Sequence, residues 1–332
     1  MWITILVILA VLLSSTLIGY FLVSKKIQKI LPGNPIEAIT KNEPLQAADG
    51  RTNFLIFGTS YDDPNPHHTG GYLTDSLIVL SVDKKAKTAY TISIPRDLWV
   101  DYDTACSLGK SGKINATYVC AMSAYKSDST KASRALADKA GAVLGLQIQY
   151  YLEVNYTFIQ SLTDALGGID VDVYSHDERG IYDPAVGLTL PAGTSHLDGK
   201  LALKLARARN SQGGYGLPRS NFDREINQQR VIAAIFKKAS ADGKLTDASG
   251  ALKLINALSG QVHTNVQTSE LRDAVATARL LDPKKIISVP LTDYMTTGTI
   301  GNQSIVRPLA GLNDYSAVQK YVSDKLHAGD AR

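Results

Sequence analysis

The chain has 332 residues, of which 44% are hydrophobic and 20% are charged. This composition predicts a folded protein and excludes a largely disordered one, and the length suffices for one large domain or two small ones. The formal net charge is +4, from 35 lysines and arginines against 31 aspartates and glutamates. So mild an excess does not by itself indicate a nucleic-acid-binding protein.

The N-terminal segment, residues 1–24, is strongly apolar and has no charged side chain between Trp2 and Val23. About twenty such residues are enough to cross a hydrocarbon core of ~30 Å, so the segment predicts a transmembrane anchor. A cleaved signal peptide is the alternative, but the stretch is long and no clear A-x-A site follows it. Three lysines (25, 26 and 29) come next, and the positive-inside rule by itself would place them in the cytoplasm.

The rest of the chain is expected to form a linker and one folded unit. Prolines, glycines and polar residues are frequent in residues 25–51, as in a linker. Residues 52–240 are predicted to form the main domain, and residues 241–332 a helical and strand extension of it. In that extension we expect helices near 251–258 and 269–281, a strand at 285–290 and a last helix around 315–326.

The segment Thr74–Val100 predicts a β-hairpin. Its two apolar or β-branched runs, Leu77–Val82 and Ala89–Ile94, read as strands with a buried face. The polar residues 83–87 between them are typical of a solvated connection. A preceding apolar segment, Asn53–Gly58, predicts the first strand of the folded part.

The register of this hairpin brings two charged residues together. If Val82 lies opposite Ala89, antiparallel pairing places Asp75 opposite Arg96 at the same end of the sheet. The proline before Arg96 cannot donate to the ladder, so the strand should end there and leave Arg96 and Asp97 in the loop beyond. The pair is either a rim salt bridge, worth about 0–1 kcal/mol, or part of a functional site.

The loop before the hairpin carries further candidate ligands. Asp63 lies twelve residues before Asp75 on a Pro- and Gly-rich loop that could fold back over the hairpin end. Two carboxylates meeting there would form a hard oxygen site suited to Mg²⁺ with several retained waters. For the adjacent His67 and His68 we expect a structural or exposed role, because neighbouring side chains point in divergent directions.

Cys106 and Cys120 are the two cysteines of the chain. Beyond a membrane span, a pair this close favours a disulfide in an oxidising compartment. A zinc site would need two more ligands of suitable spacing, and none is evident. Two unlinked buried thiols are the remaining alternative.

The most basic stretch runs from residue 204 to residue 230. Arg207 and Arg209 can share a face only if their segment is extended, because two helical positions are ~200° apart. Arg224 and Gln228 lie one turn apart on a predicted helix. Arginine forks suit oxygen-rich anions such as phosphate, although a solvated helix face is the alternative. The elements expected before this stretch are helices at 129–146, 156–166 and 197–206 and strands at 147–154 and 169–173.

Several motifs resemble the LytR-CpsA-Psr family of cell-envelope enzymes, from about residue 53 to residue 236. They occur in order and are well separated, which makes chance agreement very unlikely. The motifs are TDS at 74–76, SIPRDLWV at 93–100, KIN at 113–115, YYLEVNY and DALGGIDVDV between 150 and 173, LPAGTSHLDGKLALKLARAR at 190–209 and NFDREINQQR at 221–230.

The resemblance implies an extracytoplasmic phosphotransferase, anchored in the cell membrane by a single span. Such enzymes move a glycopolymer, for example a teichoic acid, from a polyprenyl-pyrophosphate carrier in the membrane lipid onto peptidoglycan, with Mg²⁺. The implied fold is α/β, with a central mixed, largely antiparallel sheet flanked by helices and an apolar pocket for the prenyl tail. We therefore expect the folded part outside the cytoplasm. The resemblance and the cysteine pair both favour this orientation, and we weigh them above the opposite orientation that the three lysines indicate.

By matching position, the resemblance also assigns site residues. The catalytic group comprises Asp75, Arg96, Asp97, Arg207, Arg209 and Arg224, with Asp97 as a candidate for removing the acceptor proton. Asp63 and Asp75 would hold the metal. Substrate binding falls to Lys113, Asn115, Arg219 and Gln228.

The chain departs from the family pattern at two places. Leu73-Thr74 replaces the usual arginine before the Ser-Asp pair, and Asn227 stands where a further arginine is common. Arg219 and Lys113 are the candidate substitutes for these cations. A non-catalytic polyprenyl-phosphate or cell-wall binding module therefore stays open as an alternative. An envelope-linked transcriptional regulator is less favoured, because the basic residues alternate with acidic ones instead of forming a stripe, so no nucleic-acid partner is expected.

Overall fold

The computed structural model describes residues 31–59, 73–104, 106–210, 213–241, 261–281 and 286–328. The predicted anchor at 1–24, the loop with Asp63, His67 and His68, and the predicted helix near 251–258 lie outside these residues. None of the helices within the described ranges combines the length and apolar character that a membrane span needs.

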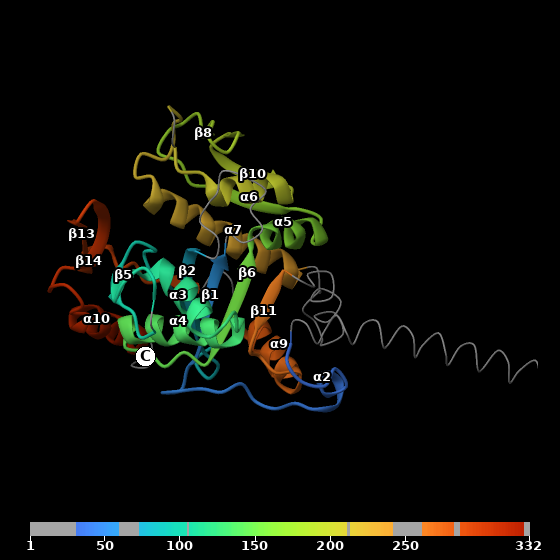
Figure 1. Cartoon of the computed structure of the whole chain (residues 1–332). Coiled ribbons are helices and arrows are strands. Elements are labelled where there is room, and N and C mark those ends of the chain that lie inside the picture. Colours follow the sequence, from blue (N-terminus) through green and yellow to red (C-terminus); the bar gives the residue numbers. More distant parts are fainter. Residues whose placement is uncertain are drawn as a thin grey trace, which may run out of the picture.

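A six-stranded mixed sheet forms the centre of the molecule, in the order β11-β6-β1-β2-β3-β12 (Figure 1). Neighbouring strands are antiparallel, except that β1 runs parallel to β6 and β3 parallel to β12. This confirms the central mixed sheet that the sequence predicts. The strands are β1 (Thr52–Thr59), β2 (Thr74–Asp83), β3 (Thr88–Ser93), β6 (Tyr150–Asn155), β11 (Val262–Thr264) and β12 (Ile286–Ser288).

The two faces of the sheet have different surroundings, because side chains alternate along each strand. Leu55 and Phe57 on β1, with Leu77 and Val79 on β2, are buried in the main core. The helices that close this core are α3 (Thr117–Ala124), α4 (Ser129–Leu144) and α10 (Ser316–His327). The opposite face, which includes Leu80, looks onto α9 (Leu271–Leu280) and a cavity described below.

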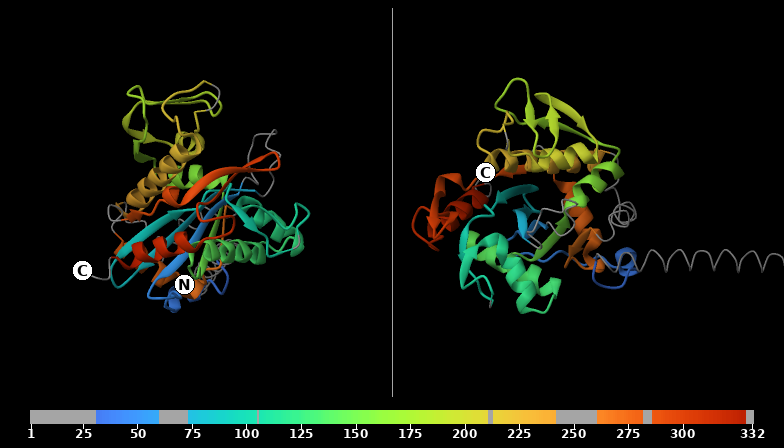
Figure 2. Two further views of the ribbon diagram at one scale, coloured as in Figure 1. Left: turned by 90° about the vertical axis from the view of Figure 1, so that its left-hand side faces the viewer. Right: turned by 45° about the horizontal axis from the view of Figure 1, so that its top comes forward.

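A second apolar core lies beside the end of the sheet. It contains Ile169, Leu197, Leu205 and Val231, which come from both strands and helices. Helix α7 lies on the side of this core that faces the central sheet (Figures 1 and 2). The unit comprises α5 (Tyr156–Ala165), β7 (Ile169–Val173), β8 (Ile181–Asp183), β9 (Leu188–Leu190), β10 (Gly193–Leu197), α6 (Gly199–Arg207) and α7 (Asn221–Ala241).

Several short helices and two-stranded hairpins lie outside the central sheet. Strand β4 pairs with β5, β13 pairs with β14, and Leu98 bridges to Val306, so the C-terminal hairpin lies against the loop after β3. These elements are α2 (Glu37–Thr40), β4 (Trp99–Asp101), β5 (Ser111–Lys113), η1 (Ile114–Ala116), η2 (Thr268–Glu270), η4 (Thr292–Tyr294), β13 (Met295–Ile300) and β14 (Gln303–Pro308).

The predicted hairpin register is confirmed, since Val82 pairs with Ala89. The predicted helix at 197–206 begins too early, because Leu197 belongs to β10 and the Asp198 side chain accepts from the Leu201 amide as the N-cap. Other differences are small. Strand β6 starts at Tyr150 instead of residue 147, and the expected helix at 269–281 is divided into η2 and α9.

Candidate functional site

Asp75 and Arg96 meet at the end of the hairpin, as the register predicts. Arg96 Nη1 donates to Asp75 Oδ1 at 2.5 Å, and the two side chains are only 24% and 14% exposed. Arg96 lies just beyond β3, after the proline that ends the strand. The pair is therefore partly buried, unlike an exposed rim salt bridge.

A β-bulge sets the direction of Asp75. Gly58 pairs with Ser76 and Thr59 pairs with Thr74, so the β1–β2 register passes over Asp75. An extra residue of this kind bends the strand locally and re-aims a side chain, and bulges are frequent next to active sites. Without the bulge, the alternation along β2 would point the Asp75 carboxylate into the main core.

The KIN segment packs directly against this pair. The Asn115 amide donates to the Arg96 carbonyl at 3.2 Å, and the Thr74 hydroxyl donates to the Asn115 carbonyl at 3.3 Å. Lys113 Nζ lies 2.8 Å from Asp97 Oδ1, so the two groups form an ion pair. Lys113, Asn115 and Asp97 thus lie at the end of the hairpin, and their roles in substrate binding and catalysis stay predictions.

The predicted disulfide is confirmed, with Cys106 and Cys120 joined at an S–S distance of 2.01 Å. It ties the loop before β5 to the buried helix α3, in which Cys120 is 1% exposed. The KIN segment lies between the two cysteines and is thereby held between two anchored ends.

Arg224 extends the cationic side of the site from the first turn of α7. The residue is 4% exposed, and its buried Nε has no hydrogen-bond partner among the described residues. Burial and the positive charges of Arg209 and Arg96 lower the pKa of Arg224 to about 10, while Asp75 and Glu225 oppose the shift. Four of the predicted catalytic residues are therefore close enough for their charges to interact, namely Asp75, Arg96, Arg209 and Arg224. The buried Arg96 Nε also lacks a hydrogen-bond partner among these residues.

The Arg207–Arg209 segment, which would have to be extended to place both arginines on one face, is extended only in part. Arg207 is the last residue of α6, and the extended backbone begins at Ala208, with φ −62° and ψ 134°. The buried Asp183 carboxylate then accepts from the amides of Arg209 and Asn210, at 2.7 and 2.9 Å. This carboxylate fixes the turn that presents Arg209.

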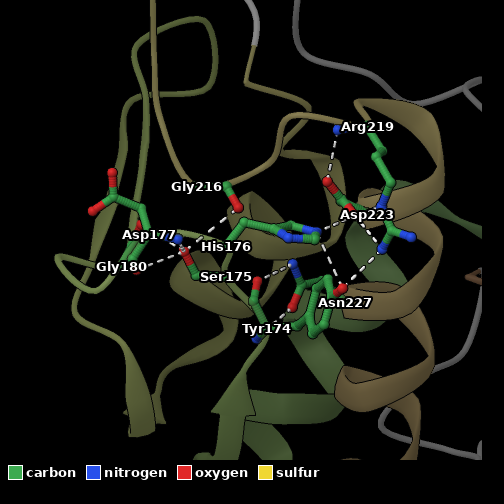
Figure 3. Close-up of polar contacts among 9 residues, drawn as sticks. All are labelled: Tyr174, Ser175, His176, Asp177, Gly180, Gly216, Arg219, Asp223 and Asn227. Atoms are coloured by element: carbon green, nitrogen blue, oxygen red, sulfur yellow. Dashed lines mark hydrogen bonds and ion pairs between the residues drawn. The ribbon is translucent and has the colours of Figure 1, made fainter.

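Gln228 and Asn227 anchor α7 to its neighbours. Gln228 Nε2 donates to the Ala206 carbonyl at 2.9 Å and so holds the end of α6. The fully buried Asn227 accepts from the Tyr174 amide and donates to the Tyr174 carbonyl, both at 3.1 Å (Figure 3). At the position where the family commonly has an arginine, this chain has a structural link between β7 and α7.

Arg219 belongs to a second polar cluster at the start of α7 (Figure 3). Its Nε and Nη2 lie 2.8 and 2.7 Å from Oδ1 of Asp223, which is 0% exposed. The His176 Nε2 atom lies 3.2 Å from the same carboxylate oxygen, and the Tyr174 hydroxyl accepts from Arg219 at 2.8 Å. The charge of Arg219 is compensated within the protein, so its contribution to substrate binding stays a prediction.

Glu225 is the site residue that the sequence reasoning missed. It lines a small pocket together with Asp75, Arg96 and Gln228. Burial, with a smaller contribution from the Asp97 charge, raises the pKa of Glu225 to about 7 against the opposing effect of Arg224. The signal available in the sequence is an acidic residue directly after the motif arginine.

An apolar cavity of about 280 Å³ lies between the sheet and α9. The β2 residues Leu80 and Val82 form part of its wall, and Ser76 and Ile78, on the same face of β2, line the small pocket. One strand therefore connects the apolar cavity with the arginine site. The other residues lining the cavity are Leu31, Phe54, Ile56, Leu152, Val262, Thr264, Val266, Leu271, Ala274, Thr277, Ala278 and Leu281.

Only one of the two predicted metal ligands belongs to the described residues. Asp75 is described, whereas Asp63 lies outside the described residues. Within the described ranges, no group of three or more His, Cys, Asp or Glu side chains could hold a metal ion. Mg²⁺ binding therefore stays a prediction.

Fold and site define an α/β protein that gathers arginines around a carboxylate at the end of a mixed sheet, with an apolar cavity on one sheet face. The family model of the LytR_cpsA_psr family matches residues 16–308 of this chain. The chain belongs to this family, as its motifs predict.

Named relatives and a solved structure agree with this assignment. The chain is 29% identical over 253 residues to a Bacillus mycoides protein named polyisoprenyl-teichoic acid–peptidoglycan teichoic acid transferase TagU, covering 76% of this chain and 70% of that one. The protein of the same name from Bacillus cereus is 32% identical over 238 residues, covering 71% of this chain but 64% of the relative, slightly less than two thirds. The crystal structure of B. subtilis TagV has a TM-score of 0.60 at 24% identity, covering 84% of this chain and 98% of that one, and supports the fold.

Proposed function

We propose that this chain transfers a glycopolymer from a polyprenyl-pyrophosphate carrier onto peptidoglycan. The observation that carries the proposal is the continuous face of β2. Ser76 and Ile78 line the pocket beside the arginines, and Leu80 and Val82 line the apolar cavity. An amphiphile with a diphosphate head and a hydrocarbon tail matches both ends of this surface.

The arginines are arranged for a multiply charged anion. Burial, together with the positive charges of Arg209 and Arg96, lowers the pKa of Arg224, and the buried Nε groups of Arg224 and Arg96 lack hydrogen-bond partners among the described residues. A diphosphate would relieve this repulsion and accept bidentate hydrogen bonds. Prearranged positive charge of this kind supplies most of the catalysis in phosphoryl transfer. The transferase names of the TagU relatives support the same reaction class.

We further propose that Mg²⁺ assists, held by Asp75 together with Asp63. The donor chemistry fits, because carboxylate oxygens are the ligands that Mg²⁺ prefers and Asp75 lies beside the arginines. When bound, the ion would neutralise part of the charge on the diphosphate. Removal of divalent ions with EDTA should abolish transfer, and added Mg²⁺ should restore it.

The experiment is a transfer assay with purified chain, Mg²⁺, a polyprenyl-pyrophosphate disaccharide and peptidoglycan. We expect release of polyprenyl phosphate and attachment of the sugar to peptidoglycan. Arg224→Ala should lower turnover by about 10²–10³-fold, as expected for removing one prearranged donor. Arg179→Ala is the matched control, because this arginine is 67% exposed and its contacts in the described structure, an ion pair with Asp177 and stacking on the Tyr215 ring, involve no residue of the small pocket. Donor binding without any turnover would instead indicate a non-catalytic binding module.

We also propose that residues 1–24 anchor the chain in the cell membrane and that the folded part lies outside the cytoplasm. The support is the apolar character of residues 1–24 and the Cys106–Cys120 disulfide, since disulfides persist in oxidising compartments. A C-terminal alkaline phosphatase fusion should be active and a cytosolic reporter fusion silent. The reverse pattern would show that the orientation is wrong.

A further inference from the structure

A cleft of about 490 Å³ lies on the other side of α7 from the Tyr174 link, facing the C-terminal hairpin. Helix α7 forms one wall, with Phe222 and Ile226. The opposite wall comes from β12, η4, β13 and β14. This cleft is distinct from the apolar cavity under α9, because no residue lines both.

The cleft adjoins the arginine pocket through a shared wall. Ser93 and Glu225 line both spaces, so the Glu225 side chain lies where the cleft meets the pocket that holds Asp75 and Arg96. A molecule in the cleft would approach the diphosphate site at this carboxyl group.

The lining of the cleft suits a sugar. The lining places hydroxyl groups and the Gln229 amide beside apolar side chains. A sugar ring needs both, because its hydroxyl groups form hydrogen bonds and its C–H face packs on apolar surface. Gln229 Nε2 donates to the Ser93 hydroxyl at 2.8 Å, and the Ser288 hydroxyl donates to Gln229 Oε1 at 3.3 Å, so the floor is ordered. Phe222, 41% exposed, supplies an aromatic surface. Further polar and apolar residues of the lining include Thr292, Thr296, Thr297, Pro290 and Met295.

We infer that this cleft seats the acceptor glycan and that Glu225 takes the proton from the attacking hydroxyl group. The inference rests on the proposed transferase function and adds the acceptor site and the base. In the reaction, the acceptor oxygen forms a bond to the phosphorus that carries the glycopolymer, and its proton passes to the Glu225 carboxylate. The bond from that phosphorus to the bridging oxygen breaks, and polyprenyl phosphate leaves with the electron pair. Glu225 then returns its proton to water.

The charged surroundings support a carboxylate that can gain and lose a proton near neutral pH. The groups around Glu225 are Arg224 on its own helix, Asp97 in the loop after β3, Arg96 and Asp75 across the small pocket, and Arg219 at the rim of the cleft. With a pKa of about 7, Glu225 is close to the optimum for general base catalysis. The earlier candidate Asp97 is engaged in the ion pair with Lys113.

The test compares Glu225→Gln and Glu225→Asp with the full chain, using a polyprenyl-pyrophosphate disaccharide as donor and a soluble uncross-linked glycan strand as acceptor. Glu225→Gln should lower kcat by about 10²-fold or more, keep donor binding, keep the wild-type melting temperature at pH 5, where Glu225 is protonated, and lose the rise of kcat with pH near 7. Glu225→Asp should retain part of the activity and the pH dependence. Asp97→Asn should retain a rise of kcat with pH, moved to lower pH because the Asp97 charge contributes to the raised pKa of Glu225.

The cleft is tested separately with Phe222→Ala, which should raise the KM for the glycan strand several-fold and leave the KM for the donor unchanged. Leu312→Ala is the matched control, because this residue is 48% exposed and does not line the cleft. If the wild type transfers the sugar and Glu225→Gln keeps the full rate and pH profile, the role of Glu225 is wrong, while the proposed transferase function stands. A wild-type chain that neither binds nor transfers the donor would overturn the proposed function and the inference together.

Discussion

At the scale of single residues, Glu225 links the chemistry of the site to the stability of the fold. Its carboxyl group has an ordinary pKa of 4.5, and in the folded protein burial raises the pKa to about 7. The folded state therefore binds more protons than the unfolded state between these two values. Stability should fall as the pH rises through this window and level off above it.

Glu225→Gln should remove this decline, because an amide does not titrate. The upper limit of the effect is about 3 kcal/mol, from 1.36 kcal/mol for each pKa unit, and partial solvation of the side chain will lower it. The measurement is urea unfolding of both proteins at pH 5 and pH 8. Glu178→Gln, at an exposed position, is the matched control and should behave like the wild type. An equal decline in wild type and Glu225→Gln would assign the effect to other groups.

At the scale of elements, the N-terminal half of α7 is held by polar contacts from two positions one turn apart on the same face. Asn227 bonds both backbone groups of Tyr174 at the end of β7, and Asp223 binds Arg219 and His176 (Figure 3). Buried polar groups that are fully paired stabilise a unique arrangement and are costly to disrupt. This arrangement fixes the turn of helix from which Arg224 and Glu225 reach the site.

Asn227→Arg, which restores the arginine common in the family, should therefore destabilise the chain and not improve it. The longer side chain would enter a fully buried site and remove both bonds to Tyr174, for a cost of about 2–4 kcal/mol. Thermal melting measures the loss, and the transfer assay should show no gain. Lys237→Arg, at an exposed position on the same helix, should leave the melting temperature unchanged. A more active and equally stable Asn227→Arg protein would mean that the missing cation matters more than the link.

At the scale of the whole molecule, the two faces of the central sheet differ: one packs a solid core and the other borders a cavity. One face is closed by α3, α4 and α10 into a packed core, and the other keeps an apolar cavity under α9. The arginine site lies at the end of the sheet, next to both the cavity and the cleft beyond α7. Tail, diphosphate and acceptor would then approach from three directions and meet at Asp75, Arg96 and Glu225.

Filling the cavity should consequently affect donors with a long tail most. Ala274→Phe, on α9 and in the cavity wall, should raise the KM for a long-chain polyprenyl-pyrophosphate donor about 10-fold and change the KM for a short-chain donor little. Ala276→Phe is the matched control, because it is exposed on the same helix and outside the cavity. Kinetics with the two donors measure the difference. Equal losses for both donors would place the tail elsewhere.

Local patterns in the sequence were enough to predict several elements and part of the site. Alternation and the polar connection at residues 83–87 determine the hairpin register, and this register places Asp75 and Arg96 at the same end of the sheet. Likewise, the cysteine pair predicts its own disulfide. These predictions succeed because each depends on residues that are close in sequence or on the geometry of one strand pair.

Only the tertiary structure decided the rest of the site. The bulge that turns Asp75 depends on β1, and the link from Asn227 depends on Tyr174, more than fifty residues before it. The raised pKa of Glu225 depends on burial against distant parts of the chain. A sequence pattern states which side chains are charged, but desolvation and pairing are set by neighbours that only folding brings close. For this reason the charge of Arg219 is compensated by Asp223, while the acid next to Arg224 becomes the candidate base.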